Sequence, residues 1–131
     1  MSQENVEMIR SVYESLNRGD WDGVFRNAHP EMELITQRGP AAGAFRGQEA
    51  IKTQVQDGFA AFEAWRIQPE EFFEGGDHVV VFVKVRSQPR GSSVEMEVRN
   101  AHLWAIRDGT IWSLKTFAVR EEALEAAGLQ E

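Results

Sequence analysis

His102, Asn100 and Tyr13 are the residues of this chain whose types and positions suit chemistry on a small molecule. The imidazole of His102 exchanges a proton near neutral pH, which suits general acid–base catalysis. Asn100 lies two residues earlier, so in a strand its amide points to the same side as His102. The hydroxyl of Tyr13 can donate a hydrogen bond. We therefore consider a site with His102 as acid or base, Tyr13 as donor, and Asn100 orienting His102 or a ligand.

Each of these residues also has a structural interpretation. Residues 94–111 alternate with a period of two, which predicts a strand with one buried side. Asn100 and His102 share that side, so they are either a hydrogen-bonded core pair or the floor of a pocket, and His102 also suits a subunit contact. Tyr13 lies on the apolar stripe of a predicted helix and suits a core tyrosine bonded to a carbonyl. The apolar residues of the buried side are Val94, Met96, Val98, Trp104 and Ile106.

The composition argues against several other functions. The net charge is −7, which disfavours nucleic acid and anionic membranes as partners. No apolar run of about 18 residues is present, so no membrane span is expected. The chain has no cysteine, and its three histidines lack zinc-ligand spacing. We expect no metal, no cofactor, and a cytoplasmic location because the N-terminus lacks an apolar signal segment.

The pattern along the chain predicts an α+β protein with one domain, residues 1–131. Helical spacing favours helices over residues 4–17 and 48–62, with a short helix capped by Asp20 between them. Residues 38–46 read as a loop. A short strand is expected at 32–37, antiparallel strands at 64–74, 77–88, 93–107 and 110–118, and a final helix at 120–127.

Charged residues alternate with apolar residues on two of the predicted strands. Glu95, Glu97 and Arg99 lie opposite the apolar set of their strand, and Lys84 and Arg86 do the same on the preceding strand. A solvated or subunit-facing side of the sheet explains this pattern. The alternative is a polar cavity lined by these charges.

Several stretches together resemble the NTF2-like superfamily, in particular its SnoaL-like branch with the ketosteroid isomerases. They include Tyr-Glu-Ser-Leu-Asn-Arg-Gly-Asp-Trp at residues 13–21, His-Pro at 29–30 and Phe-Arg-Gly-Gln-Glu-Ala-Ile at 45–51. The hairpin at 102–111 and the tail at 120–129 extend the resemblance over nearly the whole chain. It implies a cone, with a curved antiparallel sheet wrapped by three N-terminal helices and a short C-terminal helix, that encloses a cavity and commonly dimerises through sheet surfaces.

The resemblance also gives candidate site positions. The isomerase tyrosine falls on Val12, one residue from Tyr13, and its base falls on Thr36, which has no useful basicity. Its second aspartate falls on Ala101, or on His102 in the register that agrees with the apolar alternation. Steroid isomerisation is therefore not expected, and the Asp-Arg-Asp trio of the related epoxide hydrolases has no match. The pocket-lining candidates are Asn100, Thr36, Trp104, Val12, Leu34, Phe59, Trp65 and Trp112.

Two functions fit this sequence. The first is a pocket protein that binds a hydrophobic small molecule, as an isomerase, cyclase or hydrolase with His102 as acid or base. The second is a non-catalytic binding or dimerisation module whose cavity is largely filled by side chains. The expected partners are a hydrophobic ligand and a second copy of the chain.

Overall fold

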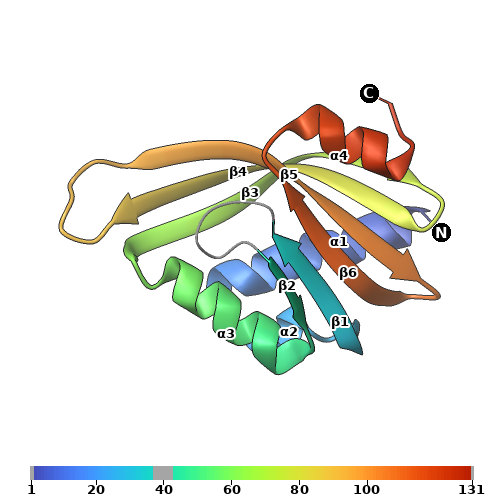
Figure 1. The fold of residues 1–131 in the computed structure, drawn as a ribbon, viewed down its shortest axis with the longest axis horizontal. Coiled ribbons are helices and arrows are strands. Elements are labelled where there is room, and N and C mark those ends of the chain that lie inside the picture. The colour runs from blue at the N-terminus through green and yellow to red at the C-terminus, as the bar shows by residue number, and fades with distance from the viewer. Residues whose placement is uncertain (1, 37–42, 131) are drawn as a thin grey trace.

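A computed structural model describes residues 2–36 and 43–130 of the chain. The fold is α+β: a curved six-stranded sheet, not closed into a barrel, with helices on both faces (Figure 1). Helices α1, α2 and α3 pack on the concave face, and α4 packs on the opposite face. The elements are α1 (Ser2–Arg18), α2 (Trp21–Val24), β1 (Ala28–Thr36), β2 (Gly43–Arg46), α3 (Gln48–Phe59), β3 (Phe62–Gly75), β4 (His78–Pro89), β5 (Met96–Arg107), β6 (Thr110–Phe117) and α4 (Arg120–Ala127).

The sheet has two apolar layers because both of its faces are covered near the middle. Val79, Val81 and Val83 of β4 join the core beneath α1, whereas Val80 and Phe82 join the cluster beneath α4. A strand buried on both sides needs a continuous apolar run, which explains the Val-rich sequence of β4. The strand order is β2-β1-β6-β5-β4-β3.

Local signals at the ends of the elements are confirmed. Gly19 ends α1 with a φ of 73°, and the Asp20 side chain accepts a hydrogen bond from the Gly23 amide at 3.0 Å to cap α2. Asp108 and Gly109 connect β5 to β6 with φ values of 52° and 74°, as a tight hairpin turn requires. Helix α4 ends at Gly128, which is left-handed.

The sheet differs from the expected one in its pairing and in its short strands. Strands β3 to β6 form the expected antiparallel meander, and β6 also pairs with β1 in parallel. A pattern of alternation carries no information on strand direction. Strand β1 starts at Ala28, before Pro30, and residues 43–46 form β2 instead of loop. The remainder of the expected loop, residues 38–42, lies outside the described residues.

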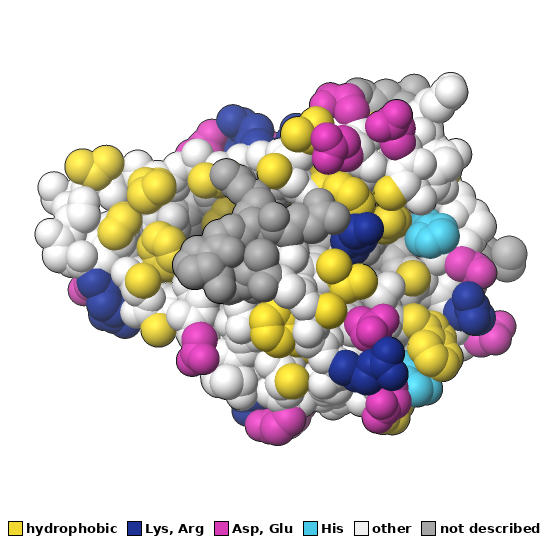
Figure 2. All heavy atoms as spheres, in the orientation of Figure 1, with side chains coloured by type: hydrophobic (Ala, Val, Ile, Leu, Met, Phe, Trp, Pro, Cys, Tyr) yellow, Lys and Arg dark blue, Asp and Glu magenta, His cyan; other side chains and the backbone are white. Residues whose placement is uncertain are grey.

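Strands β3, β4 and β5 extend beyond the helices as a projecting end of the sheet (Figure 1). Val94, Met96 and Val98 lie here with 65%, 46% and 37% of their surface exposed, so the prediction that they are buried was wrong. Trp104 and Ile106 of the same set are buried, because α1 covers that part of β5. Figure 2 shows apolar side chains spread over the projecting end.

No helix in the described part of the chain is long and apolar enough to cross a membrane.

Candidate functional site

A buried chain of hydrogen bonds joins α1 to β5. The indole Nε1 of Trp104 donates to the Tyr13 hydroxyl at 3.0 Å, and that hydroxyl lies 2.8 Å from Nδ1 of His102. Indole N–H is a donor only, so the hydroxyl accepts from Trp104 and keeps its own hydrogen to donate. We assign Nδ1 of His102 as the acceptor of that hydrogen, which places the ring proton of the neutral imidazole on Nε2.

Burial holds both ionisable members of this chain in their neutral forms. Desolvation lowers the pKa of His102 from 6.5 to about 4. Desolvation also raises the pKa of Tyr13, and the hydrogen bond from Trp104 opposes that shift only in part. At neutral pH the imidazole is thus a hydrogen-bond donor at Nε2 and a weak base, since a base acts best with a pKa near the working pH.

Asn100 lies on the same face of β5 as His102. Its strand partner is Val83, and His102 lies opposite Val81 and Thr116. The side-chain oxygen of Asn100 is buried and has no hydrogen-bond partner in the described part of the protein. A buried acceptor without a partner costs free energy, which makes this oxygen a candidate to accept a hydrogen bond from a bound group. The arrangement therefore offers an unused acceptor at Asn100 near a neutral donor at His102.

An interior cavity of about 60 Å³ lies between the helices and the concave face. Val12, Leu34 and Trp104 line it together. Asn100 and His102 are not among the residues that line this cavity.

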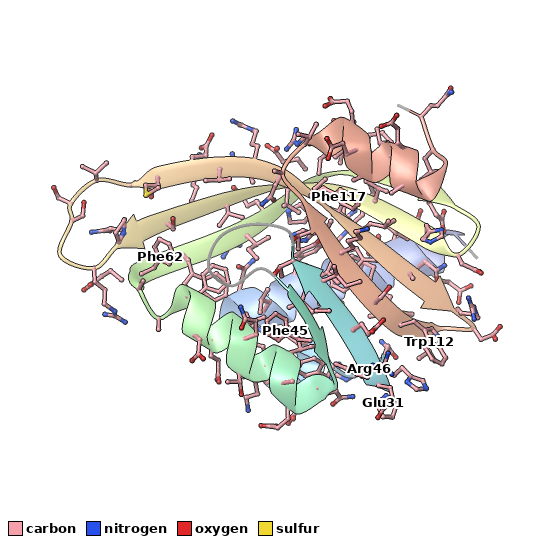
Figure 3. All side chains as sticks on the ribbon, in the orientation of Figure 1. Glu31, Phe45, Arg46, Phe62, Trp112 and Phe117 are labelled. Carbon is pink, nitrogen blue, oxygen red and sulfur yellow. The ribbon has the colours of Figure 1, made fainter. Side chains whose placement is uncertain are left out.

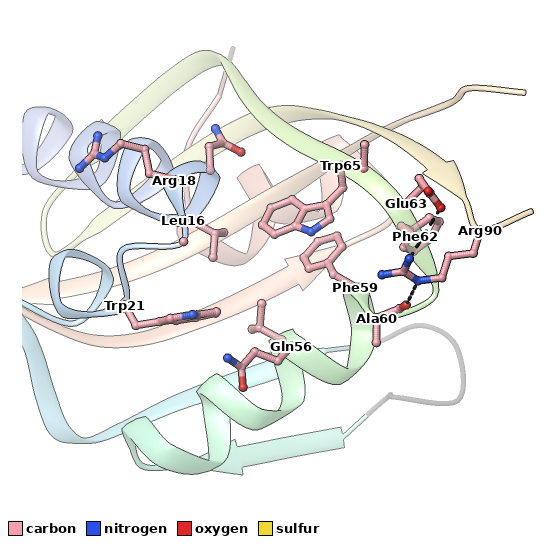
Figure 4. A pocket seen from close by; sticks show the side chains of 14 residues that line it. Leu16, Arg18, Trp21, Gln56, Phe59, Ala60, Phe62, Glu63, Trp65 and Arg90 are labelled. Atoms are coloured by element: carbon pink, nitrogen blue, oxygen red, sulfur yellow. Dashed lines mark hydrogen bonds and ion pairs between the residues drawn. The ribbon is translucent and has the colours of Figure 1, made fainter. Parts of the chain in front are cut away.

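Phe59 and Trp65 lie together at an open groove of about 510 Å³, which shares Leu16, Trp21 and Val55 with the lining of the interior cavity. Their rings stack with centroids 3.9 Å apart, and they form one wall of the groove between α1, α3 and β3 (Figure 4). Asn100 and His102 are not among the residues that line it.

Trp112 and Thr36 occupy other positions. Trp112 of β6 is 39% exposed, and its ring stacks on His29 with the ring centroids 3.8 Å apart. Figure 3 shows Trp112 close to Arg46 and Glu31, with which it lines a surface hollow. Thr36 is the half-buried last residue of β1, where it pairs with Gly43.

Sequence reasoning did not identify Trp21, Gln56 and Arg90 as residues of a groove. Trp21 follows the cap of α2 and reads as part of its buried stripe. Arg90 lies in the loop after β4, where no local pattern marks it. The three residues belong to distant segments, and only their packing creates the groove.

The described residues contain no cluster of three or more His, Cys, Asp or Glu side chains suited to a metal ion.

The curved sheet and the helices that wrap it define a cone-shaped α+β domain of the NTF2-like class. A family model described as "SnoaL-like domain" matches residues 9–114. The chain belongs to this family. No curated protein sequence matches it at a significant level.

Solved structures support the same class. TerC, crystallised with polyporic acid, is 25% identical, with 93% of this chain and 96% of TerC covered and a TM-score of 0.81. An NTF2-like protein of unknown function from Burkholderia pseudomallei K96243 is 20% identical, with coverages of 93% and 95% and a TM-score of 0.80. A protein from Catenulispora acidiphila with a ketosteroid isomerase-like fold, in complex with trimethylamine, is 16% identical, with coverages of 95% and 94% and a TM-score of 0.75.

Proposed function

We propose that this chain is a small-molecule-binding protein of the cyclase or isomerase type, in which Asn100 and His102 hold the polar part of a mainly apolar ligand. The observation that carries the proposal is the buried, unpartnered oxygen of Asn100 beside the fixed imidazole of His102. A ligand hydroxyl or amine satisfies the Asn100 oxygen, and a ligand carbonyl accepts from Nε2 of His102. TerC, with its polyporic acid complex, supports a small organic ligand for this fold.

His102 acts here as a neutral donor that polarises a carbonyl group. Its pKa of about 4 favours this role over proton abstraction at neutral pH. Tyr13 is a positioning residue, because its hydroxyl already accepts from Trp104 and donates to His102. Its contribution is to fix the tautomer and orientation of the imidazole.

Asn100→Leu tests whether the buried oxygen of Asn100 binds a ligand. If the amide only occupies space, replacing it with an apolar side chain of similar size leaves the protein equally or more stable, by up to about 2 kcal/mol. If the amide serves a ligand, the same variant binds more weakly. We expect Asn100→Leu to be at least as stable as the parent in urea unfolding and to lose affinity for polyporic acid about tenfold.

The control for the imidazole is a matched histidine substitution. His29→Asn alters a histidine that stacks on Trp112, whereas His102→Asn removes the donor in the site. Isothermal titration calorimetry with polyporic acid should show weaker binding for His102→Asn and no change for His29→Asn. Unchanged affinity in a folded His102→Asn variant, or no binding by the parent protein, argues against the proposal.

The non-catalytic module stays a second candidate. The interior cavity of about 60 Å³, walled by Val12, Leu34 and Trp104, favours it. A ligand-free crystal structure in which side chains fill the space before Asn100 and His102 supports this function.

We also propose a homodimer through the outer sheet surface. On that surface α4 covers Val80, Phe82 and Leu103, and the strands beyond it carry charged residues such as Arg86, which pairs with Glu97 at 3.4 Å. Light scattering that gives the mass of a monomer contradicts the dimer without affecting ligand binding. A cytoplasmic location and a single domain over residues 1–131 stay predictions.

A further inference from the structure

The open groove at the end of α1 has a volume of about 510 Å³. This volume lies within the range of about 300–1,000 Å³ for small-molecule sites. The end of α1, the start of α2, the second half of α3, the start of β3 and the loop after β4 all contribute to it (Figure 4). The groove therefore has walls from several rigid elements.

Partly exposed aromatic side chains gather in this groove. Phe59 and Trp65 stack almost in parallel, at 11° between their ring planes, and form one wall. The Trp21 ring lies across the groove from this pair, and Leu16 lies between the two sides (Figure 4). Aromatic rings on opposite sides of a slot favour a flat, apolar guest, because each side offers a π-face.

Arg90 marks one end of the groove. Its Nε donates to the carbonyl oxygen of Ala60 at 2.8 Å, which anchors the guanidinium group beside Phe59 (Figure 4). Nη1 of Arg90 lies 3.6 Å from Glu63, and the two side chains are 63% and 57% exposed. Such a long, exposed ion pair contributes little to stability. A ligand carboxylate that approaches Arg90 therefore displaces a weak contact and gains a charge-assisted one.

From these contacts we propose that the groove is a second ligand site, which binds a flat aromatic carboxylate. The ring system lies between Trp21 and the Phe59–Trp65 pair, and the carboxylate contacts Arg90. The site is distinct from the Asn100 and His102 side of the concave face, because neither residue lines the groove.

The test uses naphthalene-2-carboxylate as the probe and its uncharged carboxamide as the matched ligand. Titration of the ¹⁵N-labelled protein should give saturable shifts at Gly19, Gln56 and Arg90, which line the groove. We expect the carboxylate to bind about tenfold more tightly than the carboxamide, as one charge-assisted hydrogen bond predicts. Shifts centred on Asn100 and His102, or no saturable binding, overturn the proposal.

Arg90→Gln should remove the preference for the carboxylate while keeping binding of the carboxamide. Its matched control is Arg107→Gln, since Arg107 is also exposed and weakly paired, with Asp77 at 3.8 Å, but lies outside the groove. A preference that survives in Arg90→Gln, or disappears in Arg107→Gln, contradicts the assigned role of Arg90.

Trp21→Ala should weaken binding of both probes about tenfold, because it removes one wall. Trp112→Ala removes an exposed tryptophan outside the groove and should change neither affinity. If Trp21→Ala and Trp112→Ala bind the probes with equal affinity, the naphthalene ring does not lie against Trp21. His102→Asn should bind both naphthalene probes like the parent protein, so failure of the concave-face proposal is distinguishable from failure of this one.

Discussion

Tyr13 is the shared partner in the buried hydrogen-bond chain that orients His102. The Tyr13 hydroxyl receives the indole N–H of Trp104 and donates to Nδ1 of His102. Two hydrogen bonds thus link three buried aromatic side chains. Burial lowers the pKa of His102 and keeps the imidazole neutral, which links the stability of the protein to pH.

The first prediction is that the protein loses stability in acid because of His102. The folded-state pKa of His102 is about 4, below its ordinary value of 6.5. The unfolded chain therefore binds the proton more readily, so this contribution to stability is fully present above pH 6.5 and is lost as the pH falls to about 4. The difference corresponds to about 3 kcal/mol in the free energy of unfolding.

Urea unfolding of the parent and of His102→Gln across this pH range measures the effect. The variant should lack this part of the pH dependence. The carboxylates that both proteins share give the same remaining pH dependence in each. Equal pH dependence in both proteins contradicts a buried, neutral His102.

The second prediction concerns alkali and uses Tyr13, the single tyrosine of the chain. Burial raises its pKa above the ordinary 10, so the folded protein keeps the phenol protonated while the unfolded chain ionises near that value. Stability from this group is lost as the pH rises above 10. The tyrosinate absorbance should appear only together with unfolding, as followed by circular dichroism. A reversible titration of Tyr13 near its ordinary pKa in the folded state would show that the hydroxyl is open to solvent.

At the scale of elements, the short helix α2 turns the chain from α1 into β1, and close packing determines its place. Gly23 is buried where α2 meets α1. A Cβ at this position would overlap the Ser15 hydroxyl and lie 2.6 Å from the Asp20 carboxylate that caps the helix. The glycine is therefore required by the contact between the two helices.

The third prediction compares two helical glycines. Gly23→Ala should destabilise the protein by about 1–3 kcal/mol, because the added methyl displaces Ser15 or the cap. Gly58→Ala in α3 meets no atom within 4 Å and should stabilise the protein by about 0.5–1 kcal/mol through helix propensity. Chemical denaturation of both variants checks the difference, and a tolerated Gly23→Ala contradicts the tight contact.

At the scale of the whole molecule, the sheet is longer than the helical layers that cover it. The middle of β5 is buried between α1 and α4, whereas Met96 and Val98 on the projecting end are partly exposed. Local stability follows burial, so the projecting end should open more easily than the middle.

The fourth prediction is that amide hydrogen exchange reports this difference in local stability along β5. Amides of residues 96–99 should exchange faster than those of residues 101–104, although both groups pair with β4. Nuclear magnetic resonance at two protein concentrations measures it. Strong protection of residues 96–99 that increases with concentration indicates that a second copy covers the projecting end, and equal protection at low concentration contradicts the prediction.

Local patterns in the sequence determined much of this architecture. Helical spacing at Ile9, Val12 and Tyr13, the cap at Asp20 and the turn at Asp108 and Gly109 act over a few residues, so they identify the helices and the last hairpin. The family resemblance added the layered fold, which the structure confirms. Alternation also placed Asn100 and His102 on one face.

Tertiary structure alone decided which of these faces is buried and what the candidate residues contact. Met96 and Trp104 share one alternation, but α1 covers only Trp104. Tyr13 meets His102 across 89 residues of sequence, and the parallel pairing of β1 with β6 has no local signature. The groove at Trp21 and Arg90 likewise forms where distant segments pack. Periodicity sets which side of an element is apolar, and only the arrangement of the elements sets what lies against that side.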